Sequence, residues 1–191
     1  MKFVKQSLPD VVVIEPALHG DERGYFMETF RQDLLEKELG YQVNFIQDNE
    51  SKSSKGVLRG LHYQLPPFAQ SKLVRVIEGQ VLDIAVDIRV DSPTYGQHIA
   101  VELTSENKKQ VFVPRGFAHG FVVLSDFALF AYKVDNLYSP AHDRGISFED
   151  ETLAIDWRLP RAELKLSEKD KNQPLFDDAE TGFKFDVDYH D

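Results

Sequence analysis

The sequence predicts a mainly β fold, a sandwich or a barrel, with a few short helices at its periphery. Prolines and glycines interrupt the chain at short intervals, and short runs rich in Val, Ile, Phe and Tyr lie between them. Its 191 residues suffice for one well-packed domain and are few for two. No linker, repeat or low-complexity tract divides the chain, so we expect one domain spanning residues 1–191.

Ten apolar runs, each bounded by glycine, proline or polar residues, predict the strands. In chain order these runs are residues 11–14, 24–30, 45–49, 56–64, 72–78, 80–88, 97–104, 110–113, 117–124 and 127–134. The last six runs form three successive pairs, with turns at Gly79, 105–109 and 125–126. This spacing predicts three hairpins.

Helical signals are few. Residues 31–39 predict one helix, and Gly40 is placed to end it in the left-handed conformation. After Pro140 the strand pattern weakens into turns and short helices packed on the barrel. Ser167 followed by Asp170 three residues later is typical of a helix N-terminus, with the serine as its cap.

The composition excludes several classes of protein. The formal net charge of −10 argues against a nucleic-acid binder. No apolar run approaches the length of a membrane span, and the N-terminus has no signal-peptide core. The chain has no cysteine, hence no disulfide, thiolate nucleophile or cysteine-based zinc site. We therefore expect a cytoplasmic enzyme without nucleic-acid or membrane partners, and an anionic ligand would need locally gathered positive charge.

The stretch 56–64 places an arginine and a histidine in one predicted strand. A guanidinium suits a phosphate or carboxylate, and an imidazole suits proton transfer or metal ligation. Strict alternation puts Arg59 and His62 on opposite faces. Both can line one pocket only if the strand bulges, and Gly60 is the natural position for the bulge. The alternative is a hydrogen-bonded core histidine and a surface arginine.

A second histidine follows in the run Pro-Arg-Gly-Phe-Ala-His that ends at His119. A Pro-x-Gly-x-x-His run entering a strand is the second sequence motif of the cupin jelly roll. The first cupin motif requires His-x-His followed by Glu, but here the run is His62-Tyr-Gln64 and no Glu follows. A catalytic metal usually has at least three protein ligands. The sequence predicts a cupin barrel without a metal site, and otherwise His119 is structural.

Four further polar residues are candidates only if they point into the barrel. Lys72 and Asp83 share parity with apolar neighbours, so Asp83 could pair with Lys72 or His119. Alternatively, both are solvent-facing strand residues. Tyr132 is either core filler or an acid facing His62 across a cavity. Asp170 is otherwise an ordinary helix-turn carboxylate.

Together these motifs resemble the dTDP-4-dehydrorhamnose 3,5-epimerase family, and the resemblance runs through nearly the whole chain. The matching runs are residues 21–26, 47–49, 57–64, 72–76, 83–89, 113–121, 132–133, 138–145 and 166–170. The resemblance implies a homodimeric cupin jelly roll, free of metal and cofactor, that exchanges an N-terminal strand between subunits. It also implies a nucleotide-sugar substrate, dTDP-4-dehydro-6-deoxy-D-glucose, inverted at carbons 3 and 5.

The resemblance also implies residue roles. His62 would be the base held by Asp170, Tyr132 the acid, and Lys72 the group that stabilises the enolate. The implied binding residues are Arg23, Phe26, Glu28, Gln47, Asn49, Arg59, Asp83, His119 and Tyr138. Of these, Arg59 would bind the diphosphate and Phe26 and Tyr138 would stack on thymine. The partner subunit would supply Arg23 and Glu28.

The chemistry of such a substrate fits these groups. A ketone at carbon 4 acidifies both neighbouring carbons, so a base with a pKa near neutrality and a donor on the opposite face suffice. Three other interpretations stay open: an epimerase acting at one carbon only, a metal-dependent cupin oxygenase, and a non-catalytic sugar-binding jelly roll.

Overall fold

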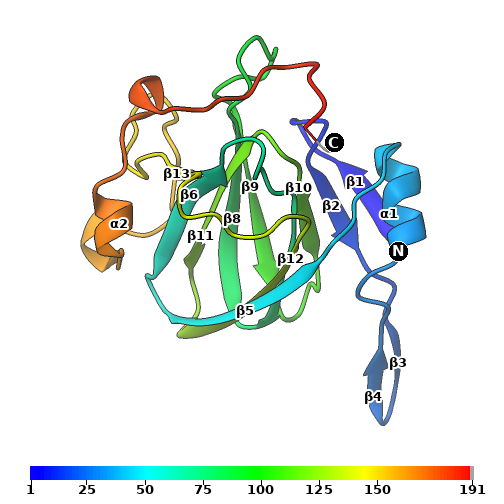
Figure 1. The fold of residues 1–191 in the computed structure, drawn as a ribbon. Coiled ribbons are helices and arrows are strands. Elements are labelled where there is room, and N and C mark those ends of the chain that lie inside the picture. The colour runs from blue at the N-terminus through cyan, green and yellow to red at the C-terminus, as the bar shows by residue number, and fades with distance from the viewer. Residues whose placement is uncertain (190–191) are drawn as a thin grey trace.

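The computed structural model describes residues 1–189, which form two antiparallel sheets packed face to face (Figure 1). The six-stranded sheet has the order β1-β2-β10-β7-β12-β5, and the five-stranded sheet has the order β13-β6-β11-β8-β9. The strands of the two sheets are β1 Lys2–Lys5, β2 Val12–Glu15, β5 Gln47–Ser54, β6 Leu58–Gln64, β7 Lys72–Glu78, β8 Gln80–Asp87, β9 His98–Thr104, β10 Gln110–Val113, β11 Phe117–Val123, β12 Phe127–Val134 and β13 Asp143–Gly145. This architecture confirms the predicted mainly β jelly roll.

The three predicted hairpins are wrong, although their strands exist. β7 and β8 flank Gly79, yet β7 pairs with β10 and β12 while β8 pairs with β9 and β11. The connections β9–β10 and β11–β12 likewise lead from one sheet to the other. Each crossing turns the apolar face of both strands into the space between the sheets. Buried area therefore decides the pairing, whereas local alternation does not encode it.

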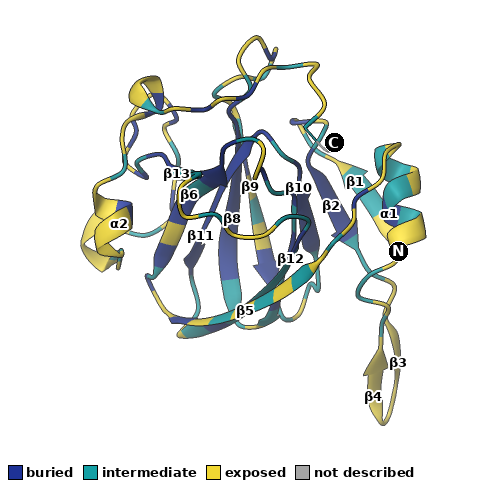
Figure 2. Ribbon diagram, viewed as in Figure 1, coloured by how far each residue is buried: buried dark blue, intermediate teal, exposed yellow. Residues whose placement is uncertain are grey.

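Apolar layers cover both faces of the five-stranded sheet, the inner face of the six-stranded sheet and part of its outer face. The core between the sheets includes Val74, Phe121 and Phe130. The outer face of the five-stranded sheet packs against the segment after β13, including Trp157 and Phe183. As a result, β11 is buried along its whole length, as Figure 2 shows by its dark blue colour. Burial on both faces explains why this strand reads as a continuous apolar run.

Helix α1, Gln32–Leu39, lies on the outer face of the six-stranded sheet. It ends at Gly40, which has a φ of 81° and donates its N–H to Glu36 O, as predicted. Helix α2, Glu168–Lys171, lies on the other side of the barrel beside β6. Two 3₁₀ turns, Arg161–Glu163 and Phe176–Asp178, complete the helical elements of the described chain. Neither α-helix in residues 1–189 has the length and apolar character needed to cross a membrane.

A small hairpin projects from the body of the protein (Figure 1). It consists of β3, His19–Asp21, and β4, Gly24–Phe26, all of whose residues are exposed. The predicted strand 24–30 is thus correct only in its first half. β5 spans Gln47–Ser54 instead of residues 45–49, and the sequence did not predict β1, β3 or β13. These are short or polar strands at sheet edges, which carry weak apolar signals.

Candidate active site

A cavity of about 480 Å³ opens between the two sheets. One wall consists of residues of β6 and β11, and the opposite wall of residues of β5, β7 and β12. The segment that leads into α2 closes a third side. The lining residues are Ser51, Val57, Leu58, Arg59, His62, Lys72, His119, Phe121, Phe130, Tyr132, Lys165, Leu166, Ser167 and Asp170.

A β-bulge at Gly60 brings Arg59 and His62 to the same cavity. Arg59 pairs with Phe121 of β11, and His62 pairs with His119. Two residues lie between the pair members on β6 but only one on β11, so β6 carries one extra residue. Gly60 has a φ of 139°, and a Cβ atom there would lie 2.5 Å from Gly120 Cα. Only glycine fits this position without strain. The predicted break of the strand is confirmed.

His62 and Asp170 form a close pair although 108 residues separate them. His62 Nε2 lies 2.5 Å from Asp170 Oδ1, with the carboxylate buried and the imidazole side chain 29% exposed. The pair depends on the cap of α2: Asp170 N–H donates to Ser167 Oγ (3.1 Å), and Ser167 Oγ donates to Asp170 Oδ2 (2.7 Å). This is the predicted capping arrangement.

The electrostatics of this pair favour an ionised carboxylate. Burial alone would raise the pKa of Asp170, but the hydrogen bonds from His62 and Ser167 and the positive charges of His62 and Lys169 outweigh it. The pKa of Asp170 therefore lies below its ordinary value. An ionised carboxylate on one ring nitrogen fixes the tautomer of His62 and leaves Nδ1 as the nitrogen available for proton transfer.

A second histidine–carboxylate pair lies beside the first. His119 is the cross-strand partner of His62, and its Nε2 lies 2.9 Å from Asp83 Oδ2. Asp83 is 1% exposed and points into the core between the sheets, where an unpaired carboxylate would be costly. Phe130 stacks on the His119 ring. The structure thus pairs Asp83 with His119 and not with Lys72, and it places His119 on the cavity wall.

Lys72 and Tyr132 lie on the wall opposite His62. Burial lowers the pKa of the Lys72 ammonium to about 8, although Asp143 and Asp83 oppose that shift. Burial raises the pKa of the Tyr132 phenol above its ordinary value, although the charge of Arg59 opposes it. Tyr132 therefore stays protonated at neutral pH and can donate. Of the orientations that the sequence left open, Lys72 and Tyr132 both adopt the one that faces the cavity.

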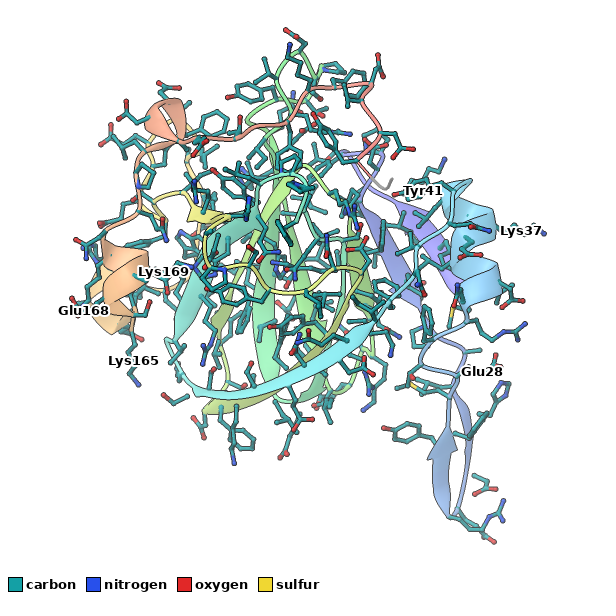
Figure 3. All side chains as sticks on the ribbon, viewed as in Figure 1. Glu28, Lys37, Tyr41, Lys165, Glu168 and Lys169 are labelled. Carbon is teal, nitrogen blue, oxygen red and sulfur yellow. The ribbon has the colours of Figure 1, made fainter. Side chains whose placement is uncertain are left out.

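Three cations line the cavity without a carboxylate partner among residues 1–189: Arg59, Lys72 and Lys165. Arg59 Nε donates to Ser53 Oγ (3.3 Å), and Lys165 Nζ donates to Ser54 Oγ (3.4 Å). Figure 3 labels Lys165 just before α2, near the start of β6. Unpaired cations in a protein of net charge −10 indicate an anionic ligand.

Sequence reasoning missed Lys165 and much of the apolar lining. A bridge between Val57 and Lys165 holds that segment against the entry to β6. The only signal in the sequence was its proximity to Asp170, five residues later. The aromatic lining residues Phe121 and Phe130, stacked 4.1 Å apart, looked like ordinary core.

Besides Asp83, which lies behind His119, six predicted binding residues do not line this cavity. Arg23 and Phe26 belong to the projecting hairpin, and Figure 3 places Glu28 on the far side of the barrel from Lys165. Gln47 and Asn49 are hydrogen-bonded to each other (2.7 Å) on β5, on the same face as Ser51, which does line the cavity. The sixth, Tyr138, is 61% exposed in the loop after β12.

The fold and the site define an acid–base enzyme in a cupin-type jelly roll, with a histidine–aspartate pair facing a tyrosine and a lysine across a cavity. No three His, Cys, Asp or Glu side chains among residues 1–189 form a group suited to a metal ion. A family model described as dTDP-4-dehydrorhamnose 3,5-epimerase matches residues 5–178, and the chain belongs to this family.

Individual relatives agree. The dTDP-4-dehydrorhamnose 3,5-epimerase of Shigella flexneri is 53% identical over 180 residues, covering 94% of this chain and 98% of that protein. The crystal structure of the same enzyme from Elizabethkingia anophelis NUHP1 is 52% identical with a TM-score of 0.90, over 93% of this chain and 97% of that one. A dTDP-6-deoxy-D-glucose-3,5-epimerase from Legionella pneumophila, solved with dTDP-4-keto-L-rhamnose, is 45% identical with a TM-score of 0.93, over 97% and 99% of the two chains. The family resemblance predicted from the sequence is confirmed.

Proposed function

We propose that this protein epimerises dTDP-4-dehydro-6-deoxy-D-glucose at carbons 3 and 5, giving dTDP-4-dehydro-L-rhamnose for dTDP-L-rhamnose synthesis. Family membership supports the reaction. The observation that carries the residue assignment is the His62–Asp170 pair, which faces Tyr132 across the cavity. A cytoplasmic location is part of the proposal.

His62 is the base. The ketone at carbon 4 acidifies the hydrogens on carbons 3 and 5, and His62 Nδ1 removes one of them. The electron pair of the broken carbon–hydrogen bond moves into an enolate whose negative charge lies on the carbon 4 oxygen. Asp170 stabilises the imidazolium that forms. Positioned proton transfer of this kind contributes about 10²–10⁴-fold to the rate.

Lys72 and Tyr132 complete the reaction from the opposite wall. The Lys72 ammonium stabilises the negative charge that develops on the enolate oxygen. The Tyr132 hydroxyl then donates its proton to the other face of the same carbon, which inverts the centre. Solvent takes the proton from His62 and returns one to the Tyr132 oxygen, so each cycle leaves both groups as they began.

The remaining groups bind the nucleotide. Arg59 and Lys165 provide positive charge for the diphosphate, and His119, positioned by Asp83, presents a ring nitrogen to the sugar end. Gln47 and Asn49 extend the binding surface along β5. Their position on the inward face of that strand, in line with Ser51, supports this assignment.

We also propose a homodimer that exchanges its N-terminal segment, so that Arg23, Phe26 and Glu28 act in the partner's site. The exposed β3–β4 hairpin supports this, because Phe26 is 66% and its neighbour Tyr25 58% exposed on an element that projects from the body of the protein. Mixing an inactive Arg23→Ala chain with an inactive His62→Ala chain should restore about a quarter of the activity, since only one site in the mixed dimer is intact. A monomeric protein, or no recovery, would refute the exchange.

The deciding experiment follows the product by NMR in heavy water. We expect deuterium at carbons 3 and 5 and a product with the L-configuration. Exchange at one carbon would indicate an epimerase for a single centre, and no exchange would indicate a binding protein. His62→Ala should abolish exchange at both carbons with an unchanged circular dichroism spectrum, and near-normal exchange in that variant would refute the base assignment.

A further inference from the structure

Gln64 occupies the position where a metal-binding cupin has its second histidine, two residues after His62 on β6. Its side chain is 4% exposed and does not line the cavity. Gln64 Nε2 donates to Phe68 O (2.6 Å) and Leu137 O (3.1 Å), and Gln64 Oε1 accepts the N–H of Ser139 (2.6 Å). All three partners are backbone atoms of two loops.

One of these loops, residues 135–142, carries Tyr138. The Tyr138 hydroxyl donates to Asp143 Oδ2 (2.8 Å), and Asp143 is the cross-strand partner of Gln64. Leu65 N–H donates to His142 O (2.9 Å), which ties the end of the loop to the end of β6. Asp143 also acts on the charge of Lys72 in the cavity wall. The loop is therefore fastened around Gln64 and ends beside the cavity.

We propose that Gln64 is a positioning residue for nucleotide binding: it holds the loop so that Tyr138 can stack on the nucleobase at the entrance of the cavity. This inference rests on the proposed function. Two N–H donors and one acceptor are needed at once, and a neutral amide supplies all of them, whereas a carboxylate supplies no donor. Replacing the amide removes the side-chain partner of two backbone carbonyls and one N–H, so the loop gains freedom.

A double-mutant cycle tests the inference, with titration calorimetry of dTDP as the readout. We expect Gln64→Met and Tyr138→Ala each to weaken dTDP binding by about ten-fold, and the double variant to be no weaker than either, because coupled residues are non-additive. KM for the sugar nucleotide should rise in parallel, with kcat at saturation changed by less than about three-fold. Gln64→Glu, which keeps the acceptor, gives the same direction if Gln64→Met does not fold.

Asn107 provides a matched control far from the cavity. Its side-chain amide also holds a turn through three hydrogen bonds, to Glu102 O, Thr104 N and Lys109 N. Asn107→Leu should lower the melting temperature and leave dTDP affinity unchanged. Wild-type affinity in both Gln64 variants, or additive effects with Tyr138→Ala, would overturn the inference alone. A wild-type protein that does not bind dTDP would overturn it together with the nucleotide part of the proposed function.

Discussion

Replacing Asp170 with asparagine removes one charge from the His62 pair and leaves the shape of the side chain. The amide oxygen can still accept from His62 Nε2, because the amide nitrogen can turn toward Ser167 Oγ. What is lost is the attraction between carboxylate and imidazolium. For charge centres about 4 Å apart this attraction is about 4 kcal/mol at an effective dielectric constant of about 20. We therefore expect kcat to fall about 10³-fold, at 1.36 kcal/mol for each factor of ten.

The assay is the rate of deuterium incorporation into the keto sugar in heavy water. Ser167→Ala is the control, because it removes the helix cap and one hydrogen bond to Asp170 but keeps the charge. It should cost about 1 kcal/mol of stability and less than about ten-fold in exchange rate. If folded Asp170→Asn exchanges within ten-fold of wild type, the carboxylate does not support the base and the reasoning fails.

Three further predictions concern Lys72, Gly60 and Tyr132. The activity of the wild type should decline as the pH rises through about 8, where Lys72 loses its charge. Folding lowers the Lys72 pKa from 10.5 to about 8, so the free energy of unfolding of the wild type should rise between pH 8 and 10.5. Lys72→Met should abolish this rise and, at pH 7, increase the melting temperature while kcat falls by about 10²-fold or more. A lower melting temperature of the variant would contradict this prediction. Gly60→Ala, whose Cβ would lie 3.0 Å from His119 O as well as against Gly120, should cost about 3 kcal/mol in urea unfolding, and a cost below about 1 kcal/mol would show that the bulge adapts. Tyr132→Phe should slow inversion about 10²-fold and leave the initial deuterium exchange largely intact, and wild-type epimerisation of both carbons would exclude it as the acid.

The sequence predicted local features well. Strand positions, the end of α1 at Gly40, the cap of α2 at Ser167 and the bulge at Gly60 each follow from a few neighbouring residues. The bulge was predictable because two polar residues of opposite parity shared a strand with a glycine between them. Such features depend on backbone sterics and on hydrogen bonds across three or four positions.

Non-local features were not predictable in this way. The prediction of three hairpins was wrong because strand pairing depends on which apolar faces meet across the barrel. Residue chemistry alone offered no reason to pair His62 with Asp170, and only the family resemblance suggested it. Lys165 went unnoticed because an exposed lysine near a helix has no distinguishing pattern; its role depends on the backbone bridge to Val57.

The distance of 108 residues between His62 and Asp170 has a consequence for the order in which the enzyme is made. At a synthesis rate of about 5–20 residues per second, the histidine precedes the aspartate by roughly 5–20 seconds. Every strand from β1 to β13 has been synthesised by then. The strands that carry His62 and Lys72 can therefore pair long before the carboxylate exists, and the His62–Asp170 pair forms only after the segment leading into α2 has packed beside β6.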